Sequence, residues 1–176
     1  MTIRETIFKC GVAGAVVLFI IGWLTWAATP MFSSQFNKFQ DESRVQETIL
    51  NNAPKSGLYT LPSCCHKEKK VDKGPFIFMS IMKEETSYNM AGSVIKAFLM
   101  KFIGACIVTG LLLQTKLNFR QSVWFIAVIG FLISFMGKMP DVIWFQFPGK
   151  FAFFCILEGV IGWFFAGLAI AKLAKR

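Results

Sequence analysis

Charged side chains are scarce in this sequence, and their scarcity is uneven. Asp, Glu, Lys and Arg make up 16% of the 176 residues, whereas an ordinary soluble domain carries roughly a quarter. The stretches 10–37, 102–115 and 121–137 contain no charge at all, and 151–171 contains Glu158 alone. A soluble globular domain is therefore excluded, and the apolar fraction of 55% points to a membrane protein.

Four mostly apolar segments are long enough to span a bilayer, which takes about 20 such residues. The predicted spans are 10–29, 96–115, 121–138 and 151–171. We predict an α-helical membrane protein with a single domain over 1–176. It consists of a four-transmembrane-helix bundle, with 30–95 as a small extracytoplasmic segment between the first and second helices.

Recognisable lipid-attachment motifs are also lacking. The first apolar segment is longer than the core of a usual signal peptide, and its Trp23 and Trp26 suit a membrane interface. We interpret it as an uncleaved anchor, and cleavage near the small residues of "TWAATP" is the alternative.

Acidic residues are outnumbered, which gives a net charge of +9. Lysine and arginine collect at the cytoplasmic ends of membrane helices, so this excess does not require nucleic acid as a partner. With four crossings, one side receives Arg4, Lys9, Lys116, Arg120, Lys172, Lys175 and Arg176. Both termini are therefore predicted to be cytoplasmic.

The segment 30–95 carries signals for one helix and one β-hairpin. Apolar residues at near-helical spacing predict an amphipathic helix over 32–54, which Pro54 and Gly57 end. The runs 57–62 and 75–82 are rich enough in aromatic and β-branched residues to form strands. The charged span 66–73 would connect them.

The connection 138–150 is rich in aromatic residues and contains two prolines. Pro140 and Pro148 argue against a simple helix here, because proline lacks a backbone N–H. Trp144 and its aromatic neighbours favour an anchor at the membrane interface. A re-entrant gating loop is the alternative.

Two ionisable residues fall inside the predicted spans. Glu158 lies 14 positions before Lys172, and Lys101 lies 15 before Lys116, so the two charges should share nearly one depth. Ionisable groups in a membrane usually face the bundle interior and pair. We predict a Lys101–Glu158 ion pair where small residues let the second and fourth helices approach closely.

That pair has three interpretations. It is a structural tether between parallel helices, or part of a proton or ion relay. In the third, Lys101 extends outward and Glu158 is protonated or meets a water-filled cleft. Transporters usually carry more polar residues in their spans, or helices broken at the midplane.

Further small residues form stripes on the first and third helices, and we expect these stripes to be packing faces. The stripes are Gly11, Ala15 and Gly22, and Ala127, Gly130, Ser134 and Gly137.

The cysteines divide by position. Cys10, Cys106 and Cys155 fall in or beside apolar helices and are expected to pack as small hydrophobes. Cys64 and Cys65 stand beside His66, the sole histidine. Adjacent cysteines rarely pair with each other, and three consecutive ligands cannot enclose one tetrahedral metal. We interpret them as a loop tip, with a partner disulfide or a metal site completed from elsewhere as alternatives.

Three strings resemble small uncharacterised integral membrane proteins of bacteria: "NNAPKSGLYTLP", "GPFIFMSI" and "GWFFAGLAIAKL". The resemblance covers most of the chain. It implies a bacterial inner-membrane location with 30–95 in the periplasm, and it supplies no activity.

No catalytic motif and no cofactor site is evident in the sequence. We expect a non-enzymatic membrane protein, an accessory or assembly subunit of a membrane complex. Its expected partners are the lipid bilayer and a membrane protein or a second copy. The alternatives are a small transporter or proton-coupled component using Glu158, and a redox or metal-handling protein using Cys64, Cys65 and His66.

Overall fold

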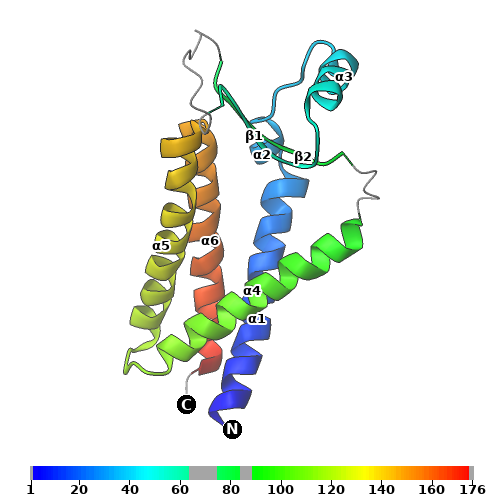
Figure 1. Ribbon diagram of the computed structural model, residues 1–176. Helices are drawn as coiled ribbons and strands as arrows, with labels where there is room; N and C mark the ends of the chain where they lie inside the picture. Colours follow the sequence, from blue (N-terminus) through cyan, green and yellow to red (C-terminus); the bar gives the residue numbers. More distant parts are fainter. Residues whose placement is uncertain (1, 64–74, 84–88, 175–176) are drawn as a thin grey trace.

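Four long helices form the body of the molecule. The computed structural model describes residues 2–63, 75–83 and 89–174. The long helices are α1 (Ile3–Trp23), which continues into a π-helical turn η1 (Leu24–Ala28), α4 (Met90–Leu112), α5 (Phe119–Phe145) and α6 (Gly149–Ala174) (Figure 1).

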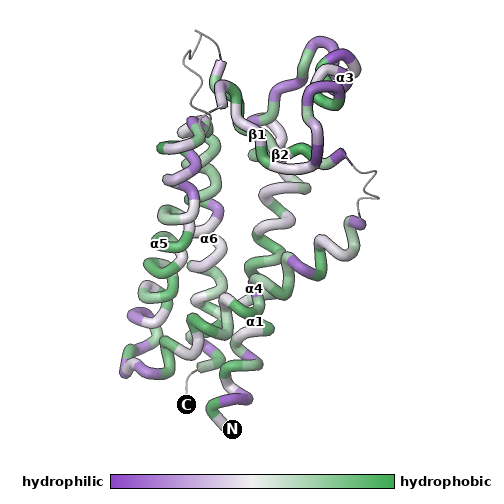
Figure 2. Tube along the Cα trace, viewed as in Figure 1, coloured by the Kyte–Doolittle hydropathy of each residue, from purple (hydrophilic) through white to green (hydrophobic). Residues whose placement is uncertain are grey.

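Each of these four helices is long and apolar enough to cross a membrane. Hydrophobic residues run along all of them, and the polar residues gather at the two ends of the molecule (Figure 2). Many large apolar side chains on the helix surfaces are exposed, as expected where lipid replaces water. The chain is therefore a multi-pass membrane protein with the predicted fold class.

A small cap joins α1 to α4, and we use this name for the described residues 30–63 and 75–83. It contains α2 (Pro30–Ser33), α3 (Glu42–Asn52), β1 (Gly57–Leu61) and β2 (Ile77–Ile81). The strands are antiparallel, with Tyr59 opposite Met79. The predicted hairpin is thus confirmed, while its predicted connection, 66–73, lies outside the described residues.

The predicted helix of this segment is confirmed as α3, but its predicted bounds of 32–54 are wrong, because α3 is shorter and the separate helix α2 precedes it. α2 ends at Ser33, and α3 begins only after Asp41. The Asp41 side chain accepts a hydrogen bond from the Arg44 backbone N–H at 2.9 Å, which fixes the start of α3.

Side-chain caps also extend the spanning helices beyond the predicted bounds. α1 begins at Ile3 rather than 10, where Thr2 and Glu5 form a capping box. α4 begins at Met90 rather than 96, where the Asn89 side chain accepts from Gly92 N–H at 2.9 Å. In both cases a polar N-cap residue starts the helix before the predicted apolar segment.

The connection predicted over 138–150 is largely helical. α5 continues through Pro140 to Phe145, and Gln146 then adopts a left-handed conformation with φ 54°. Proline removes one backbone hydrogen bond but leaves the rest of the helix intact. The expectation that prolines exclude a simple helix here is therefore wrong, and α6 follows after a short turn.

α1 packs against both α4 and α6, while α5 pairs mainly with α6. A methyl group placed on Gly14 of α1 would lie 3.0 Å from Ala105 Cβ in α4 and 2.9 Å from Ile170 Cδ1 in α6. The core therefore lies where these three helices converge, and Ala105 and Ile170 are fully buried there.

The predicted direct packing of α4 against α6 along their small residues is wrong. The small-residue face of α4 meets α1 where Ala105 lies beside Gly14, and that of α6 meets α1 where Gly162 lies beside Leu18. The two helices approach through one large side chain: Trp163 of α6 reaches Gly104 of α4, at 3.7 Å from an added methyl. The Trp163 Cβ also packs on Gly130 of α5, so this indole fills the space among three helices.

α4 crosses the molecule obliquely (Figure 1). Its C-terminal end lies near the start of α5, and its N-terminal half diverges from α5 and α6 toward the cap. Both described termini lie at the end of the molecule opposite the cap (Figure 1). We call the two ends the cap side and the terminal side.

Candidate functional site

Glu158 occupies the cap-side half of α6, about 14 Å along the helix from Gly149 at 1.5 Å per residue. Its side chain is half-buried. The Trp26 indole N–H donates a hydrogen bond to Glu158 Oε2 at 3.1 Å. An ionisable group in a spanning helix therefore has an aromatic N–H donor as its partner.

The π-helical turn η1 carries Trp26 to this position. Such turns are rare and often occur at functional sites. The Thr25 hydroxyl donates to two backbone carbonyls of the preceding turn, Ile21 O at 3.1 Å and Gly22 O at 3.0 Å. Trp26 then stacks on Phe32 of α2, with ring centroids 4.1 Å apart. The start of the cap thereby holds the indole against α6.

The Lys101 side chain of α4 reaches the same place, beside Gly22 of α1. A methyl group on Gly22 would lie 3.5 Å from Glu158 Oε1 and 3.8 Å from Lys101 Nζ. The two charges are nevertheless not in direct salt-bridge contact, and Lys101 bonds to no residue that the structure describes. The Lys101–Glu158 ion pair therefore stays a prediction.

A cavity of about 360 Å³ separates the helices around these charges. All four long helices line it, and Lys101 and Glu158 supply its charges: the lining residues are Leu18, Ile21, Met100, Lys101, Gly104, Ile133, Cys155, Glu158, Gly159, Gly162 and Trp163. Ligand pockets commonly measure about 300–1,000 Å³. The cavity is thus large enough for a small polar group.

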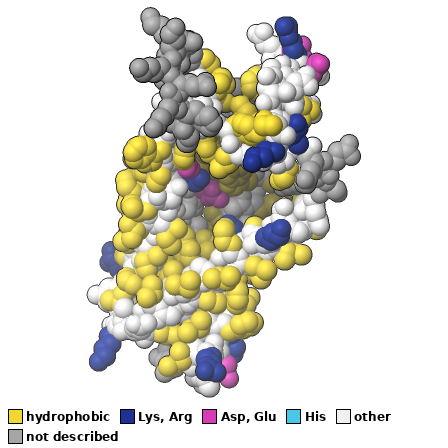
Figure 3. Space-filling view, in the orientation of Figure 1, with side chains coloured by type: hydrophobic (Ala, Val, Ile, Leu, Met, Phe, Trp, Pro, Cys, Tyr) yellow, Lys and Arg dark blue, Asp and Glu magenta, His cyan; other side chains and the backbone are white. Residues whose placement is uncertain are grey.

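A second cavity of about 330 Å³ continues from the first toward α5 and η1. The two share Ile133, Cys155 and Glu158, and the second adds Trp26 and Lys138. We call the two together the charged groove. Acidic and basic side chains gather in a hollow beneath the cap, between α4 and the α5–α6 pair (Figure 3).

Lys138 and Asp141 give the groove a second charged position. Lys138 Nζ lies 3.1 Å from Asp141 Oδ2, one helical turn away on α5. Both side chains are partly exposed. Sequence reasoning assigned these residues to a loop, so their helical pairing was missed. The continuation of α5 through Pro140 is what places them together.

Of the small residues predicted to pack, those nearest the terminal side and the middle do so, whereas those on the cap side border the groove. Gly11 meets Cys106 and Gly130 meets Trp163. By contrast Gly137 has open space beside it and lines the second cavity.

The cysteines fall into three groups. Cys10 is fully buried, and Cys106 packs on Gly11, so both fill space as expected. Cys155 is partly buried and lines both cavities of the groove. The predicted redox or metal candidates Cys64, Cys65 and His66 lie outside the described residues. Among the residues that are described, no three His, Cys, Asp or Glu side chains gather as metal ligands.

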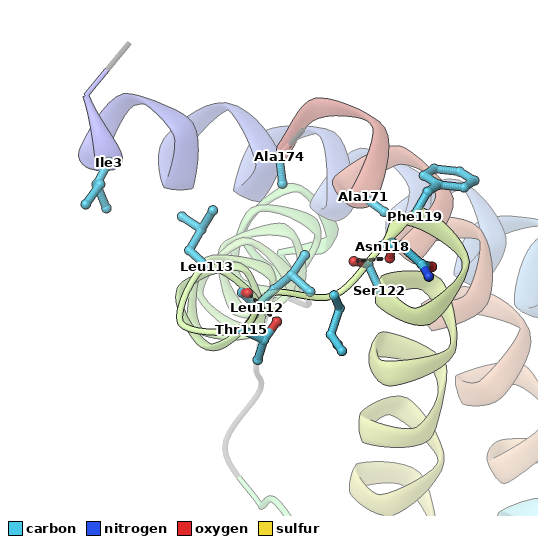
Figure 4. Close-up of a pocket in the computed structure, with 10 residues that line it drawn as sticks. Ile3, Leu112, Leu113, Thr115, Asn118, Phe119, Ser122, Ala171 and Ala174 are labelled. Atoms are coloured by element: carbon cyan, nitrogen blue, oxygen red, sulfur yellow. Dashed lines mark hydrogen bonds between the residues drawn. The ribbon is translucent and has the colours of Figure 1, made fainter. Parts of the chain in front are cut away.

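Another cavity, of about 300 Å³, lies on the terminal side, between α1, the end of α4, the start of α5 and α6 (Figure 4). Ser122 there donates to Asn118 O at 2.8 Å. The ten described residues that line this cavity include no ionisable side chain. Charge therefore distinguishes the groove from this cavity.

Comparisons of the chain with protein-family models, with curated proteins and with solved structures find no match. The functional argument therefore rests on the geometry of the charged groove.

Proposed function

We propose that this integral membrane protein is a non-enzymatic accessory protein that holds the polar part of a membrane-borne ligand in the charged groove. The observation that carries the proposal is the placement of Lys101 and Glu158. Opposite charges from two helices face one cavity inside the membrane without contacting each other.

The free energy of isolated charges in hydrocarbon supports binding over a purely structural role. A charged side chain within the bilayer is unfavourable by about 2.5–3.5 kcal/mol on insertion scales. A tether would relieve this through direct contact between the two groups. A ligand that carries complementary charges would relieve it at both residues.

The location proposed with this function is a bacterial inner membrane, with both termini in the cytoplasm and the cap in the periplasm. It is supported by the positive residues on the terminal side, such as Arg4, Lys116 and Lys172. The cap would then lie above the groove, on the periplasmic face.

Mass spectrometry of protein purified from native membranes in mild detergent tests the function. We expect an amphiphile to remain bound to the wild type in a defined molar ratio. The double variant Lys101→Gln, Glu158→Gln should lose it. Lys96→Gln is the matched control, because Lys96 is exposed on α4 and does not line the groove.

Equal retention of that amphiphile by the double variant would overturn the proposal. Retention of a protein instead, through the same two residues, would identify an assembly subunit rather than a ligand-holding one.

Proton-coupled transport by Glu158 is a second candidate. The observation that favours it is that Glu158 lines two adjoining cavities, one of which is also lined by Lys101 and the other by Lys138. Proton flux into proteoliposomes tests it: the wild type would conduct and Glu158→Gln would not, while both would fold equally well. Equal flux through both forms excludes it.

A further inference from the structure

We propose that the ligand of the charged groove is a phospholipid with a zwitterionic ethanolamine headgroup, whose phosphate meets Lys101 and whose ammonium meets Glu158. This inference rests on the proposed function and names its ligand class. It depends on the spacing of the charges, on the free acceptor of Glu158 and on the apolar walls of the groove.

The two charges require a ligand that carries both signs close together. Lys101 Nζ and Glu158 Oε1 would each lie within ordinary contact distance of a methyl group added to Gly22, yet the two groups form no salt bridge. In phosphatidylethanolamine a short ethylene link separates phosphate from ammonium. An anionic lipid would satisfy Lys101 but leave Glu158 without a counter-charge in a low-dielectric site.

The carboxylate of Glu158 favours a primary ammonium over a quaternary one. Its Oε2 already accepts a hydrogen bond from the Trp26 indole N–H. Its Oε1 lies beside Gly22, where the Lys101 side chain also lies. A primary ammonium offers three N–H donors, as a lysine does. Choline offers none, so it would gain the Coulomb attraction without a charge-assisted hydrogen bond.

The walls of the groove favour a lipid over a soluble zwitterion. Met100 and Ile133 line the larger cavity, yet they are 65% and 52% exposed, so the cavity is flanked by apolar surface. These residues lie in spanning helices, where that surface meets acyl chains. A headgroup in the cavity would leave its chains beside α4, whose N-terminal half diverges from α5 and α6.

Thermal unfolding of delipidated protein in detergent micelles tests the inference. Lipids with identical acyl chains and ethanolamine, choline or glycerol headgroups are added separately, and soluble phosphoethanolamine is a fourth arm. We expect the ethanolamine lipid to raise Tm by about 5–10 °C at saturation. The choline lipid should raise Tm by less than half as much, and the other two arms should leave it unchanged.

Two results would overturn the inference. Equal shifts with all three lipids would show a general solvent effect, and a full shift with soluble phosphoethanolamine would show that the chains play no part. Because these comparisons use the wild-type protein, they do not depend on the folding of any variant. Lys96→Gln should keep the full ethanolamine preference, and Lys101→Gln should lose it.

The failure of this inference is distinguishable from the failure of the proposed function. If a different amphiphile copurifies through Lys101 and Glu158 while the ethanolamine lipid gives no shift, the inference falls and the function stands. If nothing copurifies and no lipid shifts Tm, both fall.

Discussion

At the scale of single residues, the hydrogen-bond donor to Glu158 in the structure is an indole, and the Lys101–Glu158 ion pair stays a prediction. Trp26 donates at 3.1 Å and is itself held by its stack on Phe32, which is 1% exposed. Hydrogen bonds to charged groups contribute about 1.5–3 kcal/mol. Trp26 thus orients the carboxylate and leaves one oxygen for a ligand.

Replacement of Trp26 by phenylalanine isolates this hydrogen bond, because the ring stack on Phe32 is kept. We expect Trp26→Phe to lower the free energy of unfolding by about 1.5 kcal/mol, the lower end of that range, since Trp26 is 48% exposed. Chemical unfolding in detergent micelles measures it. Trp144→Phe is the control, because Trp144 is 73% exposed on α5. Equal losses in both variants would contradict the role of the indole N–H.

Charge scarcity revealed Glu158 and Lys101 from the sequence, because so few ionisable residues interrupt the spans. The prediction that these two residues lie at nearly the same depth is also confirmed, because both side chains lie beside Gly22. Trp26 could not be assigned in the same way. Its orientation depends on the π-helical turn η1 and on Phe32, and neither leaves a periodic signal in the sequence.

At the scale of helices, small residues predict close contact but not the partner. Trp163 packs against Gly130, and both Ala105 and Ile170 pack against Gly14. The spacing of small residues is the same whether they face a helix or a cavity. The sequence therefore indicated the stripes correctly, but could not separate the packed Gly130 from Gly137, which borders the groove.

Alanine substitution distinguishes these two glycines, which lie on the same stripe of α5. Gly130→Ala should destabilise the protein by about 1–3 kcal/mol, since its Cβ would overlap Trp163. Gly137→Ala should not destabilise the protein and should stabilise it by up to about 1 kcal/mol, because nothing lies beside it and alanine favours a helix more than glycine does. Thermal unfolding of the two variants compares them. A tolerated Gly130→Ala would show that α5 and α6 do not pack as described.

Helix boundaries were the least predictable part of the fold. The four spans and the hairpin were predicted, but α1 and α4 begin earlier and α5 ends later than expected. Hydropathy shows where apolar residues begin and end. The bounds of the helices depend instead on caps such as Asn89, where α4 begins, and on the tolerance of Pro140 within α5. The Lys138–Asp141 pair was missed for this reason.

At the scale of the whole molecule, α1 organises the bundle. It contacts both α4 and α6, and its continuation through η1 into α2 connects the bundle to the cap. The oblique path of α4 leaves the groove between its N-terminal half and the α5–α6 pair. The predicted α4–α6 interface is replaced by this groove.

Reporter fusions test the sidedness of the bundle. Because the described ends of α1 and α6 lie together, fusions at both termini should report the same compartment, and the positive residues predict the cytoplasm. A reporter active only in the periplasm, inserted in the cap, should give the opposite signal. Termini in different compartments would contradict an even number of crossings.

The central claim is that Lys101 and Glu158 act together on a ligand in the charged groove. Its most direct test is a double-mutant cycle on the lipid-induced rise in Tm, measured with the ethanolamine lipid. The wild type, Lys101→Gln, Glu158→Gln and the double variant are each compared with and without lipid. We predict that each single variant loses most of the rise and that the double variant loses little more. An equal rise in all four forms would contradict the account.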